Sequence, residues 1–129
     1  MKIVVVGARI LLGLLFTVFG LNHIVPFIHD SVPPGDAATM LGLMVEHHWF
    51  LLYGVVEAAG GLMLLAGRFV PLGLTLLAAM ITNIVLFNAT LMPKSVPMSL
   101  VVGLLELFLV YAYRASFAGI FAAKAQPAV

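Results

Sequence analysis

Long apolar stretches separated by polar breaks dominate the pattern along the chain. The first stretch runs from about residue 3 to residue 25 and stops at Pro26, which cannot donate a hydrogen bond into a continuing helix. Three more stretches follow at about residues 49–67, 71–91 and 97–115. Each has roughly the 20 apolar residues that a helix needs to cross a bilayer. The pattern predicts an all-α fold, a bundle of four transmembrane helices that forms one integral membrane domain over residues 1–129.

The break between the first two stretches, residues 26–48, is polar and much longer than the others. Loops of this length usually have a function of their own. Asp36 is expected to cap a short helix that continues to about Glu46, and its apolar side suits a segment lying at the membrane surface. A structured cover for the helix ends is the alternative. The tail, residues 116–129, is expected to continue along the membrane interface.

Composition narrows the class of protein. Hydrophobic residues make up 64% of the chain and charged residues only 9%, against about 25% charged in a soluble domain, which excludes a water-soluble globule. The absence of cysteine excludes disulfide exchange, iron–sulfur clusters and thiolate zinc sites. Six Lys and Arg spread singly along a chain of net charge +1 form no basic stripe, so nucleic acid is not an expected partner.

The positive charges predict the orientation of the bundle. Cytoplasmic flanks of membrane proteins are enriched in Lys and Arg. Only Lys94 falls on one side of the predicted spans, and the other five fall on the opposite side: Lys2, Arg9, Arg68, Arg114 and Lys124. Both termini are therefore expected in the cytoplasm, with the 26–48 loop on the outer side.

Three ionisable residues are the clear cases of charge well inside the predicted spans: Arg9, Glu57 and Glu106. Each costs a few kcal/mol in a membrane and needs a partner or a function. Counted at about 1.5 Å per residue from the cytoplasmic ends, Glu57 and Glu106 lie about 15 Å and about 14 Å deep, and Arg9 about 9 Å deep. The two carboxyl groups are thus expected to be level, within reach of Arg9. Both cannot stay ionised in a low dielectric, so a shared proton is expected.

Helical spacing predicts that these residues face one another. Residues three or four apart share a helix face, and small residues mark close helix contacts in membranes. The predicted inward stripes, one for each span, are Arg9, Gly13, Phe16, Gly20 and His23; Gly54, Glu57, Ala58 and Gly61; Ala79, Asn83, Phe87 and Thr90; and Gly103, Glu106, Val110 and Tyr113.

Three polar residues extend this cluster toward the outer surface. By the same count, Asn83 lies about 18 Å, Asn22 about 28 Å and His23 about 30 Å from the cytoplasmic ends.

Two roles of this polar cluster are consistent with the pattern: an ion pair that only fixes helix packing, and a quinol or proton-relay site. A dinuclear metal site is disfavoured, because only His23 is a plausible nitrogen ligand and no Glu-x-x-His pair occurs within a span. Asn22 and His23 could instead satisfy free carbonyl groups where the first helix ends.

Several short motifs resemble the DoxX and DoxX-like membrane proteins. They are the run from Arg9 to His23 with its glycines, Pro33-Pro34-Gly35, Val56-Glu57-Ala-Ala-Gly60-Gly61-Leu, Ala66-Gly67-Arg68-Phe69-Val70-Pro71 and Asn83-Ile-Val-Leu-Phe87. The resemblance spans roughly residues 8–116 and implies a four-helix, multi-pass protein of the bacterial inner membrane. Members of this family are associated with thiosulfate:quinone oxidoreduction, with oxidative-stress complexes or with receptor assembly. No catalytic residue set is carried over from it.

Two functions follow as hypotheses. The first is a membrane subunit of a redox system that binds a quinone or similar lipophilic molecule between the helices. Glu57 and Glu106 would handle protons, Arg9 would be their electrostatic partner, and Asn83, Asn22 and His23 would form hydrogen bonds to the ligand. The second is a non-catalytic assembly factor that holds a partner protein. Transport of a small solute is weaker, because four short helices enclose little space. The expected partners are the bilayer and either further copies of the chain or a redox protein.

Overall fold

The computed structural model describes residues 1–28 and 33–128. Its elements are α1 (Lys2–Ile24), α2 (Asp36–Glu46), α3 (Trp49–Ala66), α4 (Val70–Leu91), the 3₁₀ helix η1 (Pro93–Ser95), α5 (Val96–Ala112) and the 3₁₀ helix η2 (Arg114–Phe121). The described residues contain no strand. Four segments, namely α1, α3, α4 and η1 continued by α5, are long and apolar enough to cross a membrane. The prediction of an all-helical fold with four helices long and apolar enough to span a membrane is confirmed for the described residues.

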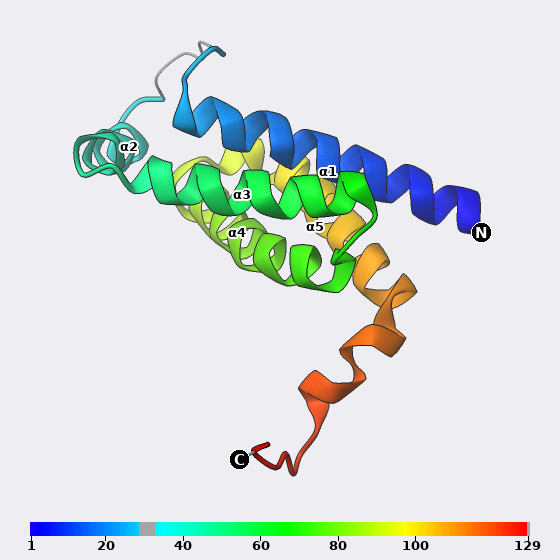
Figure 1. Cartoon of the computed structure of the whole chain (residues 1–129). Coiled ribbons are helices and arrows are strands. Elements are labelled where there is room, and N and C mark those ends of the chain that lie inside the picture. The colour runs from blue at the N-terminus through cyan, green and yellow to red at the C-terminus, as the bar shows by residue number, and fades with distance from the viewer. Residues whose placement is uncertain (29–32, 129) are drawn as a thin grey trace.

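The four long helices lie alongside one another in a bundle (Figure 1). α1 packs mainly against α3, α3 against α4, and α5 against both α4 and α1, which closes the ring. The N-terminus, the α3–α4 turn and the end of α5 lie at one end, which we call the terminal end. The described part of the loop between α1 and α3, with α2, and the α4–α5 turn lie at the other end, which we call the loop end. His29, Asp30 and Ser31, part of the predicted outer loop, lie outside the described residues.

One predicted boundary and one predicted helix cap were wrong. The last span ends at Ala112 rather than near residue 115, because the chain tightens into η2 and Phe117 of that segment turns back into the apolar core. The short helix α2 has the predicted extent, but Asp36 is its first residue and makes no capping bond. Gly35, at φ 73°, occupies the cap position, a conformation that glycine adopts without strain. Asp36 still lies where a helix dipole favours negative charge.

Glycines bring the backbones of α1 and α3 into contact. A Cβ atom on Gly20 would lie 2.5 Å from the backbone nitrogen of Ala58, and one on Gly61 would lie 2.6 Å from the backbone nitrogen of Thr17. Close approach of this kind is how membrane helices gain packing energy without a hydrophobic driving force. The predicted faces of both helices are confirmed, since Gly13, Phe16 and Gly20 on α1 and Gly54, Glu57, Ala58 and Gly61 on α3 are all buried.

These contacts also set the antiparallel register of the two helices. Gly20 lies opposite Gly54 and Ala58, Gly13 lies opposite Gly61, and the Arg9 side chain reaches Gly67, just beyond the end of α3. Residues 2–8 of α1 therefore extend past α3 by about 10 Å at 1.5 Å per residue. The overhang is visible at the N-terminus in Figure 1.

The face that α4 buries differs from the predicted one. Its buried residues are Val70, Gly73, Leu74, Leu77, Met80 and Ile81. Of the predicted stripe, Ala79, Asn83 and Thr90 are exposed and Phe87 is half-buried. Gly73 approaches the backbone of Gly60 on α3, which turns the apolar face of α4 inward. Because Asn83 follows Ile81 by two residues, it lies about 200° around the helix and points outward.

Candidate functional site

One polar contact joins α1 and α3 inside the loop-end half of the bundle. Nδ1 of His23 lies 3.2 Å from Oε2 of Glu57. The Glu57 side chain is only 3% exposed, whereas that of His23 is 30% exposed. The imidazole also stacks on Phe50, with the ring centroids 4.9 Å apart. The contact is close enough for charge pairing, but it lacks the angles of a hydrogen bond, since Nδ1 has no hydrogen-bond partner among the described residues.

The depths counted from the sequence placed His23 far above Glu57, and that prediction was wrong. The count started every span at the same level, whereas the glycine contacts shift α1 toward the terminal end. His23 consequently comes down beside the α3 residues between Gly54 and Glu57. The glycine pattern in the sequence carries this signal, because the stripes of the two helices fit together in that register.

The predicted contact of Arg9 with the glutamates does not form in the described residues. Its guanidinium lies beside Gly67, where a Cβ atom would be 2.8 Å from an Nη atom. Gly67 is ten residues from Glu57, which corresponds to about 15 Å along a helix. The Arg9 Nε is buried and has no hydrogen-bond partner in the part of the chain that is described. Arg9 thus belongs to the terminal end of the bundle.

The two asparagines are engaged in local hydrogen bonds. The Asn22 side-chain oxygen accepts hydrogen bonds from the backbone N–H groups of Phe27 and Ile28, at 2.9 Å and 2.8 Å. It therefore holds the chain that leaves α1, through amide groups rather than the carbonyl groups that the sequence suggested. Asn83 donates to the carbonyl oxygen of Ala79 in its own helix, at 3.1 Å, on the exposed face of α4. The structure does not bring Asn83 to the buried glutamates.

Glu106 has no partner of this kind. The residue is 4% exposed, and both carboxyl oxygens are buried without a hydrogen-bond partner among the described residues. A direct proton bridge between Glu106 and Glu57, as the sequence predicted, is therefore not formed. An ionised carboxylate in such surroundings is very costly, so the uncharged acid is the form that the site accommodates.

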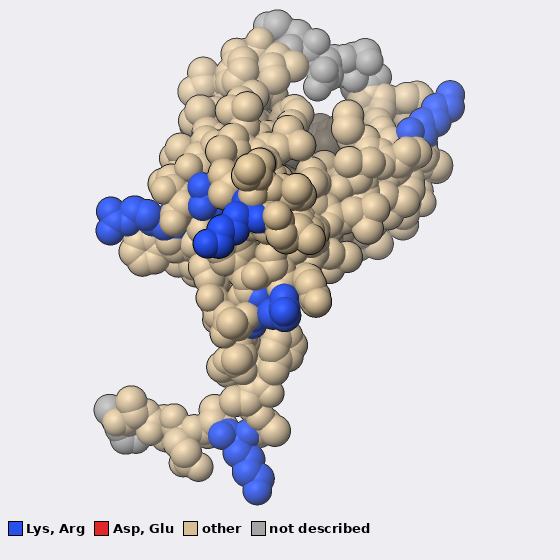
Figure 2. Space-filling model, turned by 90° about the vertical axis from the view of Figure 1, so that its right-hand side faces the viewer, with Lys and Arg blue, Asp and Glu red and all other residues tan. Residues whose placement is uncertain are grey.

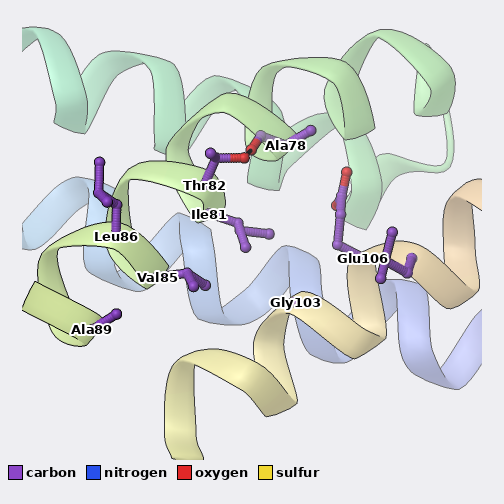
Figure 3. Close-up of a pocket in the computed structure, with 9 residues that line it drawn as sticks. Ala78, Ile81, Thr82, Val85, Leu86, Ala89, Gly103 and Glu106 are labelled. Atoms are coloured by element: carbon purple, nitrogen blue, oxygen red, sulfur yellow. Dashed lines mark hydrogen bonds between the residues drawn. The ribbon is translucent and has the colours of Figure 1, made fainter. Parts of the chain in front are cut away.

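Glu106 lies at a groove between α4 and α5 (Figure 3). The groove has a volume of about 470 Å³, and its lining is almost entirely apolar. The lining residues are Ala78, Ile81, Thr82, Val85, Leu86 and Ala89 of α4 with Gly103, Glu106 and Leu107 of α5. Thr82 donates its hydroxyl to the carbonyl oxygen of Ala78, 2.7 Å away, so its donor is already used. Glu106 is the polar group of the groove that is left without a partner.

The groove opens on the outer surface of the bundle. Thr82, Leu86, Ala89 and Leu107 are exposed, whereas Ile81 and Glu106 are buried. In a membrane-spanning bundle the surface around these residues faces the hydrocarbon of the bilayer. Small side chains at Ala78, Ala89 and Gly103 create the space. The sequence shows these small residues, but only the packing of α4 on α5 shows that they surround Glu106.

A second hollow, of about 380 Å³, lies at the loop end beside the His23–Glu57 contact. His23, Asn22, His48 and Phe50 contribute to its lining. Three or more His, Asp or Glu side chains do not come together in a metal-binding arrangement anywhere in residues 1–28 and 33–128. His23, which is 30% exposed, thus lines a hollow at the loop end.

No protein-family model, curated protein or solved structure matches the chain. The functional interpretation of the candidate site therefore depends on its geometry.

Proposed function

We propose that the chain is a small membrane subunit that binds a quinone or a similar lipophilic molecule in the groove between α4 and α5. The observation that carries the proposal is Glu106, a buried carboxyl group without a partner at an apolar groove that opens toward the bilayer. Buried polar groups are almost always hydrogen-bonded, so an orphaned one calls for a ligand or another explanation.

The chemistry of the groove suits such a ligand. An uncharged carboxylic acid offers one O–H donor and a carbonyl acceptor. A quinone ring is flat, apolar and carries carbonyl acceptors. Because both Glu106 carboxyl oxygens are buried, the side chain would turn toward the groove to donate its hydrogen bond, while the ring and tail of the ligand contact side chains such as Val85 and Leu86. A charged ligand would find no compensating charge there. Entry from the bilayer would not require the bundle to open, because the groove is on its outer surface.

A redox role requires a second protein. Reduction of a quinone to a quinol takes two electrons and two protons, and a chain without cysteine has no thiol or iron–sulfur group to supply the electrons. We assign both electrons to a redox partner. Glu106 would give one proton to the ligand and be reprotonated by water at the membrane surface, which would also supply the second proton. The Glu57–His23 pair, which lies beside the loop-end hollow, would exchange protons with the outer surface. The resemblance of the sequence motifs to DoxX-like proteins supports a redox role of this kind and a location in the bacterial inner membrane.

A photoreactive quinone analogue tests the site directly. The purified chain in lipid nanodiscs is labelled with an azidoquinone and the adducts are mapped by mass spectrometry. We expect labelling within residues 78–89 and 103–107, displaced by excess unlabelled quinone. Glu106→Leu should weaken labelling about tenfold, the equivalent of a lost hydrogen bond of about 1.4 kcal/mol. Glu106→Gln, which keeps a donor, should weaken it less.

Thr75→Val is the matched control. Thr75 is an exposed polar residue of α4 whose hydroxyl bonds to the carbonyl oxygen of Pro71, outside the groove. Its replacement should leave labelling unchanged. Labelling that is scattered over all spans, or that Glu106→Leu does not reduce, would rule out the groove as a quinone site.

An assembly role is the second candidate. Buried residues make up only 17–33% of each membrane-spanning window, so the bundle offers wide apolar surfaces that further copies or a partner protein could cover. In that case neither the unmodified chain nor the Glu106→Leu variant should be labelled by the quinone. The substitution should instead change the amount of a partner protein that co-purifies with the chain.

A further inference from the structure

The terminal end of the bundle concentrates the positive charge of the protein. Five of the six Lys and Arg side chains belong to it: Lys2 and Arg9 of α1, Arg68 of the α3–α4 turn, Arg114 of η2 and Lys124 of the tail. Figure 2, which faces this end, shows Lys and Arg side chains and no Asp or Glu. Among the described residues, the acidic side chains are those of Asp36 and Glu46 at the loop end and the buried Glu57 and Glu106.

Two of these cations lie at the same turn without an acidic neighbour. The guanidinium of Arg9 reaches Gly67, the residue directly before Arg68. The Arg9 Nε is buried and has no hydrogen-bond partner in the described chain. Like charges at close range repel each other, and an anion between or beside them offsets this repulsion. This turn therefore offers guanidinium donors to an anionic group at the boundary of the apolar spans.

Apolar side chains are interleaved with the cations at this end. Phe69 in the α3–α4 turn is 69% exposed, and Phe121 in η2 is 80% exposed. Phe117 is buried in the core and attaches η2 to the bundle. Beyond it, the tail runs across the direction of the bundle axis (Figure 1). Arg114 is held at the end of α5, with its guanidinium 4.2 Å above the Tyr111 ring. Exposed aromatic rings next to cations suit the membrane interface, where the rings can contact acyl chains and the cations can contact lipid head groups.

We propose that the terminal end is a binding surface for anionic phospholipid head groups, centred on Arg9 and Arg68 and extended by Arg114 and Lys124. The phosphate groups would accept hydrogen bonds from the guanidinium groups, and Phe69, Ile120 and Phe121 would insert among the upper acyl carbons. The lipid is preferred to a protein partner because charge and apolar rings occur together in a band across the bundle axis. η2 would then lie on the membrane rather than in the aqueous phase.

Lipid titration tests this surface. The purified chain in detergent is titrated with phosphatidylglycerol and separately with phosphatidylcholine, and bound lipid is counted by native mass spectrometry. We expect tighter binding of phosphatidylglycerol. Arg68→Gln and Arg114→Gln should each weaken it about fivefold, the effect of about 1 kcal/mol for one basic residue near an anionic surface. Raising the salt from 0.1 M to 1 M should weaken it further, since the screening length falls from about 10 Å to about 3 Å.

Lys94→Gln is the matched control, because it removes the same charge from the loop end. It should leave phosphatidylglycerol binding unchanged. Equal binding of the two lipids, or equal loss in Lys94→Gln and Arg68→Gln, would overturn the proposal. Thermal unfolding identifies any variant that fails to fold, and the salt and head-group comparisons on the unmodified chain then decide the question alone.

Discussion

Glu57 and Glu106 are both glutamates buried within spans, yet their surroundings differ. Glu57 has His23 within 3.2 Å, whereas neither oxygen of Glu106 has a hydrogen-bond partner in the described chain. The sequence identified both as exceptions in apolar helices, because a carboxyl group there is costly. It could not distinguish them, since the difference comes from which helix lies opposite each one. A paired carboxyl group is suited to stabilising the bundle, and an unpaired one to binding a ligand.

The pairing of His23 with Glu57 predicts a stability effect. His23→Leu leaves a buried carboxyl group without its neighbour and should lower the free energy of unfolding by about 1–3 kcal/mol. The double variant His23→Leu, Glu57→Leu should recover part of this loss, because the buried carboxyl group at position 57 that lost its neighbour is then also removed. Unfolding in detergent, followed by circular dichroism, measures both effects.

His47→Leu provides the comparison for this cycle, because His47 is an exposed histidine just beyond α2. It should change the free energy of unfolding by less than about 0.5 kcal/mol. If His23→Leu were equally mild, the contact with Glu57 would contribute nothing to stability.

The packing of α1 on α3 depends on glycine at positions where the two backbones meet. The sequence predicted these faces correctly, because small residues recur at helical spacing on both segments. The inward face of α4 was predicted wrongly, because its polar residues were assumed to point inward. Asn83 and several threonines of α4 instead bond to carbonyl groups in their own helix. A helix can therefore carry such side chains on a lipid-facing surface without any partner from another helix.

Gly20→Ala should destabilise the α1–α3 pair. The added Cβ atom would lie 2.5 Å from the backbone nitrogen of Ala58, so the helices must move apart. Overpacking of this kind costs about 1–3 kcal/mol. Gly7→Ala is the matched control in the same helix, since nothing lies within 4 Å of a Cβ atom there. It should leave stability unchanged or raise it slightly, because alanine favours a helix. Similar thermal midpoints for the two variants would contradict the close packing.

The charge asymmetry of the bundle predicts how it is inserted. Lys and Arg are enriched on the cytoplasmic side of membrane proteins, and five of the six lie at the terminal end. Because the chain has no cysteine, single cysteines report their location without background. A membrane-impermeant maleimide added to intact spheroplasts should label Glu46→Cys at the loop end at once. Ser116→Cys at the terminal end should be labelled only after permeabilisation, and the reverse pattern would show the opposite orientation.

The sequence alone determined the class and the local structure of this protein. Four apolar stretches of sufficient length, separated by proline and charged residues, predict four helices able to span a membrane, because unpaired backbone groups are too costly in hydrocarbon. Glycine spacing likewise determined the facing surfaces of α1 and α3. The tertiary structure alone decided the register between helices. That register brought His23 to Glu57, moved Arg9 to the terminal end and left Glu106 at the groove between α4 and α5. Depth along one helix follows from counting residues, but depth relative to a neighbour depends on where the two backbones can meet.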